Sequence, residues 1–212
     1  MMTTFDFNDG NGPVPAHKHP NGGGWVADTA KVDETAYVGR DARVYDNACV
    51  YDNARVSDNA LVYGYAQVSG NAWVYGNAVV CSDAQVYGDA WVLEDARVSG
   101  DARVSGNAQV YGSARVSGNA LVFGNAQVYG DAQVYSNAIV SGNAWVFGNA
   151  QVLDDAWVLD DAQVSGSAIV SGNTRVTDNA WVYGNAKVSQ EDMFIEMNIE
   201  MNGKRYKLVE VE

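Results

Sequence analysis

Valine recurs at every sixth position of this chain from Val26 to Val188, at 28 positions without a shift of phase. Alanine stands two residues before the valine at 26 of 27 positions from Ala30 to Ala186, and Thr174 is the exception. The pair that ends each unit is mostly Gly or Asp followed by Asn or Asp, as in YGNA, SGNA and LDDA. A repeat of this strictness gives equivalent residues equivalent surroundings, so we expect one repetitive structure over the whole segment.

The period of six favours strands over helices. On a helix, successive valines would lie about 600° apart and would spiral around its surface instead of forming a stripe. In an extended segment, the Ala and the Val point to one face, and the residue that follows each of them points to the other. Gly, Asn and Asp tolerate positive φ and bond their own backbone, so the last pair of each unit closes a turn. The sequence therefore predicts an all-β solenoid of short stacked strands.

From about Trp25 to Ser189, units such as VYGNAQ and VSGNAW resemble the hexapeptide repeat of the bacterial hexapeptide-transferase superfamily. The chain departs from that pattern by placing Tyr, Ser, Phe or Leu after the valine, which leaves the inward positions unchanged. The resemblance implies a single-stranded, left-handed, triangular parallel β-helix with three hexads per coil. The 27 hexads then make about nine coils.

The six-residue repeat divides the chain into three predicted regions. They are an irregular N-terminal cap at residues 1–24, the repeat at 25–190, and a C-terminal β-hairpin cap at 191–212. Asn202-Gly203 indicates a two-residue hairpin that pairs Met201 with Lys204, Ile199 with Tyr206, Met197 with Leu208 and Glu200 with Arg205. The hairpin is expected to cover the last coil, with a dimerisation surface as the alternative.

The N-terminal region holds all three prolines and the pair His17 and His19. In an extended segment both rings would lie on one side, and Asp6 and Asp9 are the other candidate ligands near in sequence. We interpret the histidines as ordinary cap residues, and a metal site is the alternative. The stretch PAHKHPNGGGWVADTA resembles the N-terminal heads of uncharacterised phage and bacterial repeat proteins.

Charge and composition limit the partners. The formal charge of −13 disfavours direct binding of nucleic acid and of anionic membrane surfaces. The N-terminus has neither the basic nor the apolar region of a signal peptide, and no stretch is long and apolar enough to span a bilayer. We expect a cytoplasmic protein, with association with a virion as an alternative. Cys49 and Cys81 show no metal-ligand spacing and are expected to be small packed side chains.

The sequence offers no catalytic site. The resemblance implies acyltransferase or carbonic anhydrase activity that depends on histidines, but no histidine follows Trp25 and no insertion interrupts the repeat. The acidic pairs Glu94-Asp95, Asp154-Asp155 and Asp160-Asp161 fall at turns, where we interpret them as solvated turn residues rather than glycosidase acids. We therefore predict no enzyme, no catalytic residue, no cofactor and no metal.

With three hexads per coil, outward positions stack at a spacing of 18 residues. One face then carries 10 aromatic residues in 18 positions, against 4 in 20 and 4 in 18 on the other two. This candidate interaction face consists of Tyr37, Trp73, Tyr75, Trp91, Tyr111, Tyr129, Trp145, Phe147, Trp181 and Tyr183. The alternative is that aromatic side chains shield the strand ladder and bind nothing. A spacing of 12, which groups alternate hexads, separates the aromatic residues more sharply. They then occupy 15 of 28 outward positions in one set of hexads and 3 of 28 in the other, which leaves coils of two strands as an alternative.

These observations predict a non-enzymatic structural or interaction β-solenoid. The aromatic face of this rigid acidic scaffold would dock another copy, as a dimer or trimer, or another protein. Three alternatives remain: a surface that binds carbohydrate through Trp and Tyr, an acidic decoy that imitates DNA, and an acyltransferase-like member of the hexapeptide superfamily.

Overall fold

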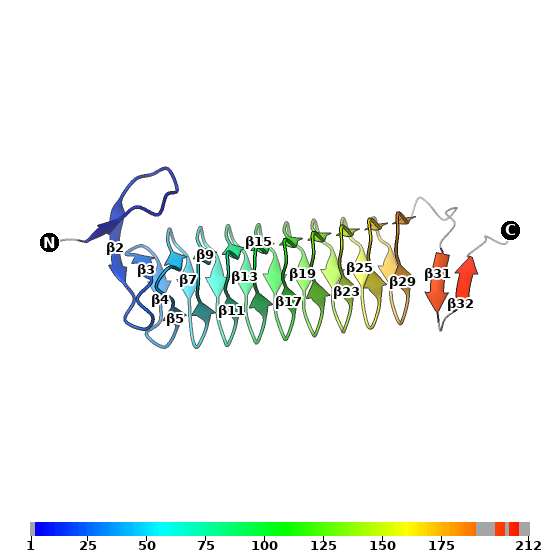
Figure 1. Ribbon diagram of the computed structural model, residues 1–212, viewed down its shortest axis with the longest axis horizontal. Coiled ribbons are helices and arrows are strands. Elements are labelled where there is room, and N and C mark those ends of the chain that lie inside the picture. The colour runs from blue at the N-terminus through cyan, green and yellow to red at the C-terminus, as the bar shows by residue number, and fades with distance from the viewer. Residues whose placement is uncertain (1–2, 190–197, 202–203, 208–212) are drawn as a thin grey trace.

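The computed structural model describes residues 3–189, 198–201 and 204–207, and shows an elongated stack of coils (Figure 1). Each hexad contributes one short strand made of the residue after the alanine and the valine itself. Each strand pairs in parallel with the strand 18 residues away, as Trp73 and Val74 do with Trp91 and Val92. The described residues contain no helix. The chain is thus an all-β parallel solenoid.

Three long sheets form the sides of the solenoid. Sheet 1 contains β1 (Thr4–Phe5), β2 (Val14–Lys18), β3 (Trp25–Ala27), β6 (Arg43–Val44), β9 (Leu61–Val62), β12 (Val79–Val80), β15 (Arg97–Val98), β18 (Arg115–Val116), β21 (Gln133–Val134), β24 (Gln151–Val152), β27 (Ile169–Val170) and β30 (Lys187–Val188). Sheet 2 contains β4 (Lys31–Val32), β7 (Cys49–Val50), β10 (Gln67–Val68), β13 (Gln85–Val86), β16 (Arg103–Val104), β19 (Leu121–Val122), β22 (Ile139–Val140), β25 (Trp157–Val158) and β28 (Arg175–Val176). Sheet 3 contains β5 (Tyr37–Val38), β8 (Arg55–Val56), β11 (Trp73–Val74), β14 (Trp91–Val92), β17 (Gln109–Val110), β20 (Gln127–Val128), β23 (Trp145–Val146), β26 (Gln163–Val164) and β29 (Trp181–Val182).

From β3 to β30 every third strand belongs to the same sheet, so each coil has three sides and the solenoid has about nine coils. The alternative of two strands per coil, drawn from the 12-residue spacing of aromatic residues, is therefore wrong. That spacing instead makes outward side chains alternate along sheet 2, where Ser69, Tyr87, Ser105 and Phe123 occupy successive coils.

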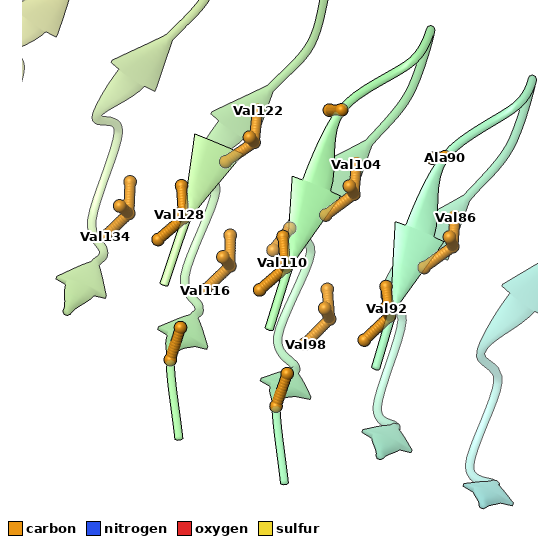
Figure 2. Packing of buried hydrophobic residues seen from close by; sticks show 14 of the residues in the cluster. Val86, Ala90, Val92, Val98, Val104, Val110, Val116, Val122, Val128 and Val134 are labelled. Atoms are coloured by element: carbon orange, nitrogen blue, oxygen red, sulfur yellow. The ribbon is translucent and has the colours of Figure 1, made fainter. Parts of the chain in front are cut away.

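The core is one continuous column of alanine and valine. From Ala36 to Val170, every alanine and valine at the inward positions of the six-residue repeat is fully inaccessible to solvent. Figure 2 shows valines from the three sides, such as Val98, Val104 and Val110, directed into the same interior. The column opens at its ends, where Val32 and Val188 are only partly buried. In the last coil Thr174 replaces alanine, and its hydroxyl donates a hydrogen bond to the Ser171 carbonyl oxygen at 2.7 Å.

The N-terminal cap is more regular than the sequence predicts. β1 pairs antiparallel with β2, and β2 pairs antiparallel with β3, so the cap adds two strands to sheet 1. Its aromatic side chains explain the difference, because Phe5 stacks on Trp25 and Phe7 stacks on Tyr45, with ring centroids 4.4 and 4.9 Å apart. Phe7 is 4% exposed, so the cap has a small core of its own.

The C-terminal hairpin forms with the predicted register. β31 (Asn198–Met201) and β32 (Lys204–Lys207) are antiparallel and pair Ile199 with Tyr206 and Glu200 with Arg205. Cα atoms of β31 lie within 8 Å of those of β29, so the hairpin lies near the last coil of sheet 3 (Figure 1). The predicted turn at Asn202-Gly203 and the pair Met197 and Leu208 lie outside the described residues.

Candidate functional site: an aromatic ladder on sheet 3

All ten residues of the candidate interaction face lie on or directly after strands of sheet 3. The strands carry Tyr37 and the four tryptophans, and the remaining five aromatic residues stand one position after a buried valine. The fold therefore brings together on one side of the solenoid side chains that the sequence spreads over almost 150 residues (183 − 37 = 146).

The four tryptophans are the exposed members of this face. Trp73, Trp91, Trp145 and Trp181 have 37 to 39% of their surface accessible, whereas the other six residues are half-buried. They stand in one column, because Trp73 pairs directly with Trp91 and the two others follow after intervening glutamines. The face thus presents a line of large apolar side chains parallel to the solenoid axis.

Two of the tryptophans of this face stack on one another along the axis. Trp73 and Trp91 lie with centroids 5.5 Å apart and planes inclined by 15°. Arg55 occupies the strand before Trp73, and its guanidinium group lies 5.0 Å from the ring centroids of both Tyr37 and Trp73. Both faces of the Trp73 indole are therefore covered, one by a cation and the other by a second indole.

A second stack lies in the neighbouring column. Tyr111, Tyr129 and Phe147 are parallel within 3°, with centroids 4.8 and 5.0 Å apart. These spacings match the distance between strands, so the backbone ladder itself sets the stacking. Burial raises the pKa of both Tyr111 and Tyr129 above the usual value. The Tyr111 hydroxyl donates to Gln127 Oε1 at 3.2 Å, which fixes the ring edge at the surface.

The acidic pairs have structural roles at the corners. Glu94, Asp154 and Asp160 adopt positive φ, and each carboxylate accepts a backbone N–H 18 residues later, from Gly112, Gly172 and Asp178. Their neighbours Asp95, Asp155 and Asp161 accept the side-chain amide hydrogens of Asn77, Asn137 and Asn143. The pairs therefore link successive coils at exposed turns.

The two cap histidines have different surroundings. His17 is exposed, and its Nδ1 lies 2.8 Å from Asp28 Oδ1, whereas His19 is 3% exposed with Nδ1 3.2 Å from the Asn21 carbonyl oxygen. Sequence proximity suggested Asp6 and Asp9 as partners, but the antiparallel pairing of β2 with β3 brings Asp28 to His17 instead. Among the described residues, no group of three or more His, Cys, Asp or Glu side chains could hold a metal ion.

Cys49 and Cys81 are both free, and Cys81 is buried at 7% exposure on sheet 1. In the described part of the chain, no helix is long and apolar enough to cross a membrane.

Comparison with known families agrees with this architecture. Five segments, residues 54–66, 66–82, 96–112, 114–130 and 132–148, match the family model described as YdcK Beta solenoid repeat. This chain is a β-solenoid repeat protein. The matched segments together make up less than half of the chain and all lie in the coils, where they include Trp73, Tyr111 and Phe147 of the aromatic face. No curated protein matches the sequence.

Proposed function

We propose that this protein is a non-enzymatic scaffold, a rigid acidic β-solenoid that associates through its aromatic face with a second copy of itself. The observation that carries the proposal is the column of tryptophans on sheet 3, where four indoles on one side of the solenoid keep more than a third of their surface exposed. Exposed tryptophans in one line are typical of surfaces that become buried on association.

The form of the solenoid supports a scaffold role. Its strands stack in regular register, and the alanine and valine interior from Ala36 to Val170 is closed to solvent, so sheet 3 has little freedom to change shape. A preformed surface loses little conformational entropy when it binds. The face is also long, since it runs along nine strands from β5 to β29.

Carbohydrate binding is the weaker candidate for this face. Sugar rings stack on the flat faces of Trp and Tyr, but Trp73 is covered by Arg55 and Trp91, and Tyr129 by Tyr111 and Phe147. These rings present mainly their edges to solvent. A flat protein surface can pack against ring edges, which favours a protein partner.

We also propose kinship with the hexapeptide-repeat superfamily. Coils of three hexads support it. The side chains that line the described coils include no histidine, which favours a scaffold over an acyltransferase within that superfamily.

Mass in solution tests the scaffold proposal. We expect sedimentation equilibrium to give a dimer or trimer, and association to strengthen as salt screens the repulsion between chains of charge −13. The variant Trp73→Gln/Trp145→Gln should be monomeric, because it removes two of the four exposed indoles. It should still fold, because glutamine already occupies this column at Gln109 and Gln127. The control Phe123→Ser removes an equally exposed ring from sheet 2 and should keep the wild-type mass. A monomeric wild-type chain at all salt concentrations would show that the self-association proposal is wrong.

A further inference from the structure

The N-terminal cap leaves a groove where it lies over the first coils. The groove has a volume of about 630 Å³, within the usual range of small-molecule sites. One wall comes from the cap, with Phe7 and Asp9, and the other from the corner that follows sheet 1, with Asp28, Asp46 and Tyr65 in three successive coils. We call this feature the cap groove.

Aromatic rings line the cap groove. Tyr45 and Phe7 are stacked with centroids 4.9 Å apart and are 6% and 4% exposed, so they form a fixed apolar surface. Tyr65 is different, because it is 62% exposed and has the highest exposure of the large apolar side chains in the described structure. It occupies a turn position that recurs in each hexad from Thr29 to Asn185. All the other hexads carry Asn, Asp, Ser or Thr at this position. The repeat itself does not account for a tyrosine there.

The charge of the cap groove is negative. Asp9, Asp28 and Asp46 line it, and no Lys or Arg is among its lining residues. Hydrogen bonds from Asn11 lower the pKa of Asp9, which keeps that carboxylate ionised. Asp46 accepts one N–H, from Gly64 at 3.2 Å, and Asp28 contacts His17. A carboxylate has about four acceptor sites, so capacity remains on both.

The basic side chains near the groove already have partners in the fold. Arg43 donates to the Phe7 carbonyl oxygen at 3.3 Å, and its guanidinium group lies 5.7 Å from the Phe5 ring centroid. The Nδ1 atom of His17 lies 2.8 Å from Asp28 Oδ1. The carboxylates do not form a group that could hold a metal ion. Apolar rings together with the carboxylates of Asp9 and Asp46 match a ligand that has a positive group on an apolar body.

We propose that the cap groove binds a small organic cation, a primary ammonium on an aromatic or alkyl skeleton. Phe7 and Tyr63 cover the two faces of the Tyr45 ring, so the apolar body packs against the ring edges of Tyr45 and Phe7. The ammonium group is held by Asp46 and Asp9, and Tyr65 covers the ligand from the solvent side. This site is distinct from the aromatic face, which lies on sheet 3.

Isothermal titration of the full chain with phenethylammonium chloride tests the proposal. We expect saturable binding, about tenfold weaker for the neutral analogue 2-phenylethanol and absent for phenylacetate. Asp46→Asn should weaken binding at least about fivefold, because asparagine tolerates the positive φ of 58° and keeps an acceptor for the Gly64 N–H while losing the charge. The matched control is Asp154→Asn, at the same corner six coils away, where φ is 59° and the acceptor role is the same, and it should bind as wild type.

A second variant removes the tyrosine without disturbing the turn. Tyr65→Asn restores the commonest residue of this turn position and should weaken binding about fivefold. Tyr87→Ser, on sheet 2 between Ser69 and Ser105, should have no effect. The proposal is wrong if phenethylammonium gives no saturable heat, if 2-phenylethanol or phenylacetate binds as well, or if Asp154→Asn loses as much affinity as Asp46→Asn.

Discussion

The indole rings of Trp73 and Trp91 stack on adjacent strands of sheet 3, with centroids 5.5 Å apart and planes inclined by 15°. The two residues are 18 positions apart, and the backbone hydrogen bonds of one coil to the next hold them at this distance. Side chains in such a column stabilise the coil above and the coil below at the same time. Stacking thus contributes to stability, and the exposed edges remain free for association.

The stack of Tyr111, Tyr129 and Phe147 allows this contribution to be measured. A double-mutant cycle of Tyr111→Ala and Tyr129→Ala should give a coupling energy of about 0.5–1.5 kcal/mol in urea unfolding, because the two rings are parallel and in contact. A cycle between Tyr129 and Tyr87, which lie on different sheets, should give a coupling near zero. Equal couplings in both cycles would contradict a direct ring contact.

Truncation of the valine core should cost most in the middle of the solenoid. Val110 is fully buried, so Val110→Ala leaves a cavity between coils and should lower the free energy of unfolding by about 2 kcal/mol. Val188→Ala removes the same atoms from a half-buried site in the last coil and should cost less than half as much. Urea denaturation of both variants checks this prediction. Equal losses of unfolding free energy would contradict the deeper burial of Val110 than of Val188.

Replacing a corner glycine by alanine should lower the stability of the fold more than replacing it by aspartate. Gly106 has φ of 66°, and an added Cβ would lie 3.0 Å from the Gly124 carbonyl oxygen. Gly106→Ala should therefore destabilise the fold by about 1–2 kcal/mol. Gly106→Asp should cost less, because its carboxylate can accept the Gly124 N–H as Asp52 accepts that of Gly70 at 3.0 Å. Thermal unfolding decides between them, and an aspartate as costly as alanine would contradict this role of the corner carboxylates.

Stability should fall at alkaline pH through Tyr45. Burial, together with the charges of Tyr63, Asp46 and Asp9, raises the pKa of Tyr45 above its ordinary value near 10. Because the folded chain holds this proton more tightly, the contribution to stability is complete below about pH 10 and is lost as the pH rises further. In urea unfolding at pH 8 to about pH 11, Tyr45→Phe should lose less stability than wild type. Identical pH profiles would contradict this assignment.

The sequence predicted the coils well because each coil repeats one local rule. Alanine and valine alternate with outward residues, so the buried positions of Val98 or Val110 follow from the period alone, and the Asn202-Gly203 signal gave the correct register of β31 and β32. The sequence alone does not give the number of sides, because the 12-residue spacing of aromatic residues competes with the 18-residue spacing of the coils. The pairing of strands 18 residues apart, such as Trp73 with Trp91, decides between them.

The cap and its groove could not be predicted in the same way. Phe7 stacks on Tyr45, 38 positions further along the chain (45 − 7), and no repeat relates the two. The partner of His17 was also missed, because Asp28 reaches it only through the antiparallel turn between β2 and β3. One signal was present in the sequence, namely Tyr65 at a turn position otherwise held by Asn, Asp, Ser or Thr. Its meaning depends on the neighbouring cap residues, which only the fold brings together.

The amide ladder at one corner runs in a single direction: Asn107 donates to Asn125, Asn125 to Asn143, and Asn143 to Asp161. Any new coil of 18 residues that preserves this donor-to-acceptor order could be inserted between existing ones without a mismatch at either boundary. Each added coil would lengthen the solenoid by about 4.8 Å, so the length of the protein can be changed by whole coils without altering its cross-section.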